Sequence, residues 1–187
     1  MKEGESFMKK LNIKTIAFAG VLIAMNLVLA RVLAINIGPT LRITLSTTPI
    51  FLAGLWFGPV VGGICGVSAD LLGCILQGYA PNPFILVTSL LSGVLPAVMK
   101  KHLFHNRINP WKIAVIVAVH GLVGSLGFTT VGLHIYYGTP WAVLYTTRVI
   151  QTVALVIANS LLVSLLYHSP LTSYVGKELA VQRVRRS

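Results

Sequence analysis

The chain has 187 residues, of which 55% are hydrophobic and only 10% are charged, and its formal net charge is +11. Its mean hydropathy of +0.82 is unlike that of a soluble domain, in which about a quarter of the residues are charged. This composition excludes a water-soluble domain and, with its long charge-free stretches, predicts an all-α integral membrane protein.

Six transmembrane helices are expected along the chain. A spanning helix needs about 20 mostly apolar residues, and glycine and proline interrupt the longer charge-free stretches at Gly58-Pro59, 77–83 and 136–140. The predicted helices are 12–35, 44–57, 60–77, 84–103, 112–135 and 141–167, of which the second is short and is expected to be tilted or partly re-entrant. They form one domain over 1–187, with short basic tails at about 1–11 and 170–187.

The first apolar segment could also be a secretory signal peptide. It runs past Ala30 without a convincing small-residue cleavage site, so a membrane helix is the favoured interpretation. Cys65 and Cys74 do not share a face of the third helix. They are interpreted as packing residues and not as a metal-binding pair.

Positive charges predict the orientation of the bundle. Most of the 15 lysines and arginines fall in three regions that six spans would place on one side: Lys2, Lys9, Lys10, Lys14, Lys100, Lys101, Arg107, Lys112, Lys177, Arg183, Arg185 and Arg186. By the positive-inside rule this side is cytoplasmic, so both termini are expected inside and the net charge requires no nucleic-acid partner. Contact of the same residues with anionic membrane lipid is left open.

The remaining basic residues are Arg31, Arg42 and Arg148, and all three fall in the outer half of the predicted bundle. Asp70, the one acidic residue away from the chain ends, belongs to the same layer. Ionisable side chains inside a membrane are costly and usually face a bundle interior or a water-filled cavity. Two interpretations stay open. Asp70 pairs with one arginine while the others reach the headgroups, or the surplus positive charge forms a pocket for an anion, best a carboxylate.

Neighbouring residues favour an interior position for these charges. Gly62, Gly66 and Asp70 follow one stripe of the third helix, so small residues allow close helix approach on the face that carries the acid. A polar face on the sixth helix consists of Arg148, Gln151, Thr152 and Asn159. Ligand contact and interhelical hydrogen bonds are both open explanations for that face.

Two outer loops are rich in aromatic and amide side chains: Tyr79, Asn82, Phe84, Tyr136, Tyr137 and Trp141. An interfacial aromatic belt explains such residues without any ligand. As a set they could instead form stacking walls for a flat heterocycle, with Asn82 adding hydrogen bonds to its edge.

No catalytic machinery is expected. The sequence contains no G-x-x-x-x-G-K-[S/T] phosphate loop and no second carboxylate beside Asp70 for a proton or sodium relay. His120 and His134, the two histidines within spans, lack the acidic partner of a metalloprotease helix. A non-enzymatic binding protein without metal or cofactor is therefore predicted.

Three segments resemble a known family. Residues 42–54 (RITLSTTPIFLAG) and 55–73 (LWFGPVVGGICGVSADLLG) are similar to the substrate-binding S components of energy-coupling factor (ECF) vitamin transporters. The outer-loop segment 78–84 (GYAPNPF) looks most like the folate-specific branch. The overall likeness covers nearly the whole chain, whereas the specific motifs lie within about 42–96.

The resemblance implies a vitamin-binding subunit of the cell membrane, with its site near the extracellular face and gated by the outer loops. It implies as partners a transmembrane coupling protein and two cytoplasmic ATPase subunits, which agrees with the missing phosphate loop. Docking in this family uses small residues on the first helix, commonly A-x-x-x-A. The closest match here is Ala17, Gly20 and Ala24, which departs from that pattern by a glycine.

Folate is the ligand that the resemblance favours. It carries two carboxylates and a pterin whose edge can donate paired hydrogen bonds to a carboxylate. The expected contacts are Asp70 and Asn82 with the pterin edge, Tyr79, Phe84 and Tyr136 with its plane or the aromatic spacer, and Arg31, Arg42 and Arg148 with the glutamate end. The alternatives are another ligand of the same family, such as pantothenate or a pyrimidine, and a stand-alone secondary transporter.

Overall fold

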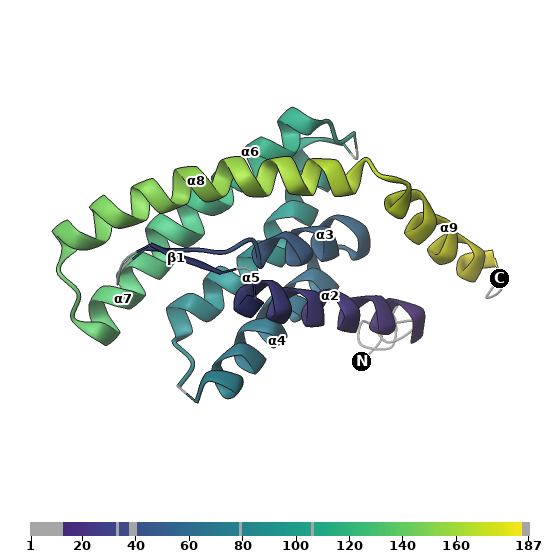
Figure 1. Ribbon diagram of the computed structural model, residues 1–187. Helices are drawn as coiled ribbons and strands as arrows, with labels where there is room; N and C mark the ends of the chain where they lie inside the picture. The colour runs from purple at the N-terminus through teal and green to yellow at the C-terminus, as the bar shows by residue number, and fades with distance from the viewer. Residues whose placement is uncertain (1–12, 33, 38–40, 79, 106, 185–187) are drawn as a thin grey trace.

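The computed structural model describes residues 13–32, 34–37, 41–78, 80–105 and 107–184. These residues form helices and one short hairpin (Figure 1). The elements in chain order are α2 (Ile13–Val32), β1 (Ile35–Ile37), β2 (Leu41–Ile43), α3 (Thr47–Phe57), α4 (Pro59–Gln77), α5 (Pro83–Val98), η1 (Met99–Leu103), α6 (Pro110–His120), η2 (Gly121–Thr129), α7 (Thr130–Tyr137), α8 (Trp141–Tyr167) and α9 (Pro170–Val184). The segments η1 and η2 are π-helical; η1 continues α5, and η2 joins α6 to α7.

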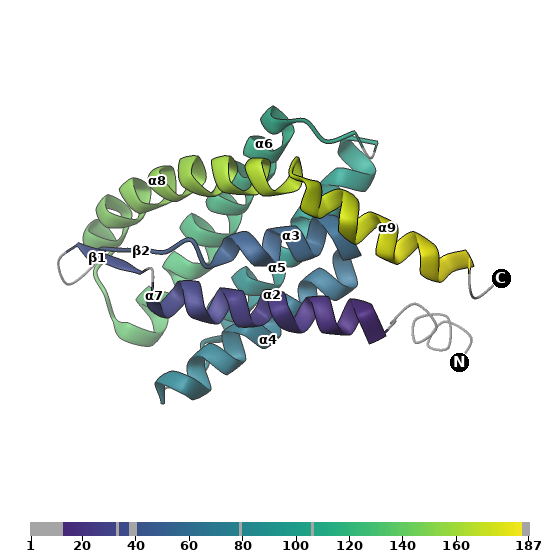
Figure 2. The ribbon, with the colours of Figure 1, turned by 45° about the vertical axis from the view of Figure 1, so that its right-hand side comes forward.

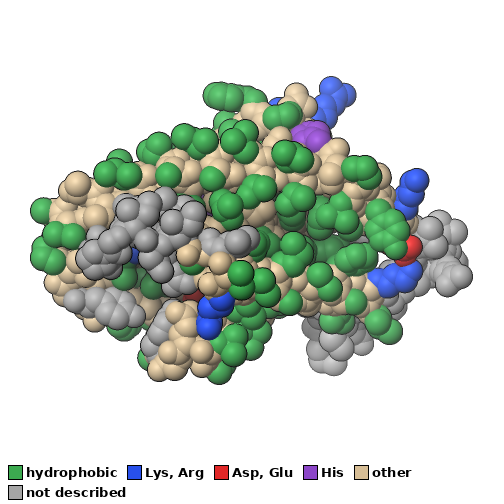
Figure 3. Space-filling view, viewed as in Figure 1, with side chains coloured by type: hydrophobic (Ala, Val, Ile, Leu, Met, Phe, Trp, Pro, Cys, Tyr) green, Lys and Arg blue, Asp and Glu red, His purple; other side chains and the backbone are tan. Residues whose placement is uncertain are grey.

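Five helical stretches are long and apolar enough to cross a membrane: Ile13–Val32, Pro59–Gln77, Pro83–Leu103, Pro110–Tyr136 and Trp141–Tyr167. Hydrophobic side chains cover much of the surface (Figure 3), as expected for helices that face lipid. The predicted helical membrane architecture is confirmed in these elements. The predicted second span is α3, which has 11 residues. Its length of about 16 Å is roughly half of a bilayer core. The described residues therefore contain five helices of spanning length, and the predicted count of six is not confirmed.

The short helix α3 lies in the interior of the bundle, where it packs against α2, α4, α5 and α8. Every residue from 48 to 55 is buried. Phe51, Leu52 and Leu55 form an apolar cluster with side chains of α6 and α8. A helix that is apolar on all sides is stable only when it is surrounded by other elements, which explains this central position.

Residues 44–46 connect β2 to α3, and α2 provides partners for their polar groups. Asn26 Nδ2 donates a hydrogen bond to the Ser46 carbonyl oxygen (2.6 Å), and Thr44 Oγ1 donates to the Leu29 carbonyl oxygen (3.4 Å). Non-helical backbone at membrane depth is tolerated where protein satisfies it. Helix α2 therefore supports the chain where it enters the bundle core.

The hairpin of β1 and β2 was not predicted, because the segment was assigned to the first outer loop. The strands pair in antiparallel register with Asn36 opposite Arg42, and β2 packs against α8. Isoleucine is frequent in both strands and favours extended backbone. Strands of 3 residues each are too short to give a recognisable alternating pattern.

Glycines bring α4 and α5 into backbone contact. A Cβ atom on Gly62 would lie 2.5 Å from the Gly93 carbonyl oxygen, and a Cβ atom on Gly66 would overlap the Ser89 carbonyl oxygen. Residues with larger side chains would force the two helices apart. The predicted close approach along the Gly62 and Gly66 stripe is confirmed.

Residues 170–184, assigned to a basic tail from the sequence, form α9. Ser169 Oγ accepts a hydrogen bond from the Leu171 amide (3.3 Å) and Pro170 is the first helical residue, a combination that favours a helix start. The helix is fixed to the bundle by an ion pair between Lys14 and Glu178 and by a hydrogen bond from Trp56 Nε1 to Thr172 Oγ1 (3.1 Å). The start of α2 and α9 therefore lie at the same end of the molecule (Figure 2).

Candidate functional site

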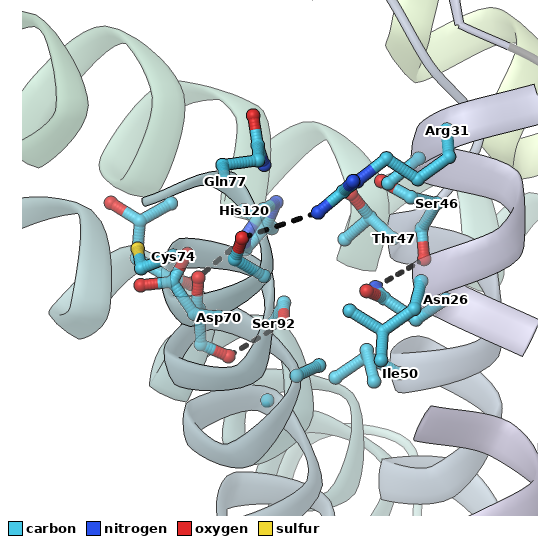
Figure 4. A pocket seen from close by; sticks show the side chains of 17 residues that line it. Asn26, Arg31, Ser46, Thr47, Ile50, Asp70, Cys74, Gln77, Ser92 and His120 are labelled. Carbon is cyan, nitrogen blue, oxygen red and sulfur yellow. Dashed lines mark hydrogen bonds between the residues drawn. The ribbon is translucent and has the colours of Figure 1, made fainter. Parts of the chain in front are cut away.

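A polar cavity of about 180 Å³, here called the Asp70 cavity, lies among α2, α3, α4 and α5 (Figure 4). Its charged and amide side chains are Asn26, Arg31, Asp70 and Gln77, and hydroxyl groups and the His120 ring complete its polar lining. Arg31 belongs to the last turn of α2 and Gln77 is the last residue of α4. The cavity therefore lies toward the end of the bundle opposite the Lys14 and Glu178 pair.

Asp70 is the unusual group in this cavity. The Gly66 contact with the Ser89 backbone holds this part of α4 against α5, so the following turn places the Asp70 carboxyl group close to the Ser89 side chain. The Oδ2 atom of Asp70 is buried and has no hydrogen-bond partner among the described residues. A buried acceptor without a partner costs about 1–3 kcal/mol. The site is therefore suited to a ligand that donates hydrogen bonds to this oxygen.

Arg31 lines the same cavity but is exposed. Its Nη2 atom lies 3.4 Å from the Gly73 carbonyl oxygen, a weak hydrogen bond. Within the described residues the one ion pair is that of Lys14 with Glu178, so neither Arg31 nor Arg148 pairs with Asp70. The structure gives no support to a helix-locking pair with either arginine; the side chain of Arg42 lies outside the described part.

A second cavity of about 140 Å³, here called the Arg148 cavity, lies among α3, η2 and α8. The four polar residues of the sixth predicted helix all line it: Arg148, Gln151, Thr152 and Asn159. Two of them make interhelical hydrogen bonds, because Thr48 Oγ1 donates to Asn159 Oδ1 (2.7 Å) and the Ser125 and Thr152 hydroxyl oxygens are 3.0 Å apart. Hydrogen bonding within the bundle thus accounts for part of this face, and the guanidinium of Arg148 adds a positive charge to it.

The two cavities adjoin each other, because Thr47, Thr88 and His120 line both of them. The His120 ring meets Phe51 edge to face at 5.0 Å between centroids, and its Nε2 atom is 3.3 Å from the Thr88 carbonyl oxygen. His120 was considered from the sequence only as a metal ligand. Its position on a charge-free span was the one available sign of an interior role.

The outer-loop residues occupy a different place from the charged ones. Asn82 caps α5, since its Oδ1 atom accepts a hydrogen bond from the Phe84 amide (3.0 Å) and its Nδ2 atom donates to the Gly132 carbonyl oxygen (3.2 Å). The Phe84 and Tyr136 rings meet edge to face at 6.3 Å. These three residues line neither cavity. Tyr79 lies outside the described residues.

The small residues proposed for docking are on the outside of α2. Ala17, Gly20 and Ala24 are all exposed, and no atom lies within 4 Å of a Cβ atom built on Gly20. The opposite side of the same helix contributes Asn26 to the Asp70 cavity, whereas Arg31 follows the exposed face and reaches the cavity from the end of the helix. Helix α2 therefore has one face toward the cavity and one face exposed in the described chain.

Apolar helices around adjoining polar cavities are typical of membrane proteins that bind a polar small molecule in their interior. Residues 14–167 match the family model described as "ECF transporter, substrate-specific component". The chain therefore belongs to the family of ECF transporter substrate-specific components, which are substrate-binding subunits and not enzymes.

Two relatives narrow the similarity within the family. The folate transporter FolT of Clostridium novyi (strain NT) is 28% identical over 145 residues, which cover 77% of this chain and 81% of the relative. A crystal structure of FolT bound with folic acid superposes with a TM-score of 0.68 at 25% identity and covers 81% of this chain and 91% of that one. The predicted resemblance to S components, and to their folate-specific branch, is confirmed.

Proposed function

We propose that this chain is the folate-binding subunit of an ATP-driven ECF importer in the cell membrane. The observation that carries the proposal is the buried Asp70 oxygen, which faces a polar cavity and has no partner among the described residues. The amino and ring N–H groups of a pterin would supply the missing donors as a pair. The similarity to FolT supports the same ligand.

The site is proposed to face the outside of the cell. Arg31 and Gln77 lie at the ends of α2 and α4, away from the end of the bundle that carries the basic residues of α9 and of the loop after η1. The positive-inside rule places that basic end, with both termini, in the cytoplasm. Residues 41–46 and α3 would together form the second of six membrane passages.

The outer-loop residues are proposed to close the site. Phe84 and Tyr136 pack against each other, and Asn82 holds the start of α5 to α7. We assign the remaining contacts with bound folate to two residues. Tyr79 precedes α5 in the chain, and Arg42 lies on β2. Asn82 would act by fixing the loop, because both groups of its amide are already engaged.

Transport would require partner subunits. A coupling protein in the membrane would dock on the exposed face of Ala17, Gly20 and Ala24, and two ATPase subunits would supply the energy, since the sequence contains no phosphate loop. Co-expression with coupling protein and ATPases tests this arrangement. The chain should co-purify with them, and Gly20→Leu should reduce the yield of complex without reducing folate binding. Folate uptake by the chain alone in liposomes under an ion gradient would instead indicate a secondary transporter.

Isothermal titration of the purified protein in detergent tests the ligand. Folate should bind in a saturable manner, and pantothenate and thiamine should not. Asp70→Asn should weaken folate binding by about 1–3 kcal/mol, because the charge-assisted pair of hydrogen bonds is lost. Ser68→Ala is the matched control, since Ser68 lies on the same helix and lines neither cavity. Unchanged affinity in Asp70→Asn would remove Asp70 from the site, and binding of pantothenate or thiamine alone would replace folate as the ligand.

A further inference from the structure

We infer that the Asp70 cavity and the Arg148 cavity hold the two opposite ends of one ligand, the donor-rich ring and the carboxylate tail, and that His120 is the positioning residue between them. This inference rests on the proposed function and deepens it. It separates Arg148 from Arg31, which the sequence had grouped at the same end of the ligand.

The two cavities have opposite electrostatic character. The Asp70 cavity contains a carboxylate oxygen without a hydrogen-bond partner in the described chain. The Arg148 cavity contains a guanidinium group that forms no ion pair with a described acidic residue. A ligand that is rich in N–H groups at one end and anionic at the other complements this pair, because each end satisfies one uncompensated group.

The cavity volumes also favour a shared ligand. Ligand pockets in proteins usually measure about 300–1,000 Å³, whereas these cavities measure about 180 and 140 Å³. Neither one is large enough for a pterin, an aromatic spacer and a glutamate together. Either cavity alone accommodates one end of such a molecule.

Side chains, and not a helix, separate the cavities. Thr47, Thr88 and His120 line both, and rotation of a side chain costs far less than displacement of a helix. The partition is polar, since Thr129 Oγ1 donates to Thr88 Oγ1 (3.0 Å) and Thr88 Oγ1 lies 3.1 Å from the Gly124 carbonyl oxygen. A ligand that passes this partition therefore meets groups that can hydrogen-bond to it.

Glycine leaves the space that His120 needs. A Cβ atom on Gly124 would lie 3.2 Å from His120 Nε2 and 2.9 Å from Thr88 Cγ2. Gly124 belongs to η2, the π-helical segment within the long helical stretch Pro110–Tyr136. Interruptions of this kind inside α-helices are frequent at functional sites, and here the interruption lies beside the shared wall of the two cavities.

Arg31 is the competing partner for the carboxylate tail. It shares its cavity with Asp70, so an anionic group bound there would lie near another carboxylate. Arg148 has hydroxyl and amide neighbours instead. The carboxylate tail is therefore assigned to Arg148, and the variants of the two arginines give opposite results under the two assignments.

Calorimetry with two ligands tests the assignment of the tail. The first ligand is folate, and the second is its bis-amide, which has the same ring and length but no carboxylate charge. Arg148→Gln should weaken folate binding by about 10-fold or more and weaken bis-amide binding much less, because the bis-amide lacks the charge that the guanidinium pairs with. Asp70→Asn should weaken both ligands equally, and Arg31→Gln should retain the preference for folate over the bis-amide. Arg148→Lys should restore part of that preference, which shows that charge and not folding is lost.

Three results would overturn the inference. If Arg148→Gln keeps the full preference for folate, the tail does not reach the Arg148 cavity. If Arg31→Gln abolishes the preference, the tail lies in the Asp70 cavity. If wild-type protein binds no folate, the proposed function itself fails and the inference fails with it. The first two results are distinguishable from this one, because in both of them the wild-type protein still binds folate.

His120 has its own test. His120→Trp enlarges the shared side chain and should weaken folate binding by about 10-fold, and should weaken the binding of 6-methylpterin, which has no tail, clearly less. His120→Gln, which keeps a polar side chain of smaller size, should bind both ligands. Equal weakening of folate and 6-methylpterin in His120→Trp would assign His120 a packing role only.

Discussion

The two halves of α4 present the same face to α5, but one half packs tightly against it and the other half borders a cavity. In the first half, Gly62 and Gly66 let the helix backbones touch. In the second half, Asp70 and Cys74 line an open cavity. The comparison teaches that a tightly packed half holds the helix pair in place, so that the other half can keep a carboxylate with one unpartnered oxygen in position for a ligand.

The largest effect is expected where the packed half is broken. A Cβ atom on Gly93 would overlap the Gly62 carbonyl oxygen, so Gly93→Ala should lower the free energy of unfolding by about 3 kcal/mol. Thermal unfolding in detergent measures this change. Gly20→Ala is the control, since no atom lies within 4 Å of its Cβ position. Equal melting temperatures for the two variants would contradict the backbone contact.

A smaller effect is expected at the start of α5. Asn82→Ala removes both the helix cap and the hydrogen bond to the Gly132 carbonyl oxygen, and should destabilise the protein by about 2 kcal/mol. Asn82→Ser keeps a cap acceptor and loses the amide donor, so its melting temperature should fall between those of wild type and Asn82→Ala. A loss of folate affinity without a loss of stability would return Asn82 to the ligand contacts that the sequence suggested.

In the second half of α4, substitution of Asp70 should reduce ligand binding without reducing stability. Asp70→Asn removes the charge from a carboxylate whose buried Oδ2 atom has no hydrogen-bond partner among the described residues, so the ligand-free protein should be at least as stable as wild type. Its stabilisation by folate should fall by about 1.4 kcal/mol for each tenfold loss of affinity. Melting curves with and without folate separate these two quantities. A ligand-free Asp70→Asn protein that melts far below wild type would make Asp70 a structural residue.

The smallest effect is expected at the other end of the bundle. Glu178→Gln removes the ion pair with Lys14, which is exposed, and should cost no more than about 0.5 kcal/mol. Unfolding at low and high salt measures the contribution, because salt screens exposed pairs. A larger loss that persists at high salt would show that α9 is anchored through this pair and not through Trp56 and Thr172.

Hydropathy was sufficient to locate the long helices, because lipid demands apolar stretches of a set length. The two short strands and α9 were not predicted. The strands owe their conformation to their pairing with each other and, for β2, to packing on α8, and neither leaves a periodic pattern in 3 residues. The start of α9 was visible in Ser169-Pro170, a signal that the basic composition of the segment concealed.

The charged candidates were predictable because ionisable groups are rare in membrane spans. Arg31, Asp70 and Arg148 do line cavities, although the sequence gave no sign that the two arginines lie in different ones. Asn82 shows the opposite limit. An amide in an outer loop can bind a ligand or cap a helix, and only its contacts with Phe84 and Gly132 decide between them.

Helix α2 links the Asp70 cavity on one of its faces to the exposed surface on its other face. Its inner surface supplies Asn26 to the Asp70 cavity and supports the segment that leads into α3, while Ala17, Gly20 and Ala24 are exposed on its outer surface. Because a helix moves as a stiff rod, a tilt imposed from the outer surface changes the shape of the cavity. In the same way, a ligand in the cavity resists that tilt. A subunit docked on α2 would therefore meet a higher resistance to tilting in the ligand-bound state than in the empty state.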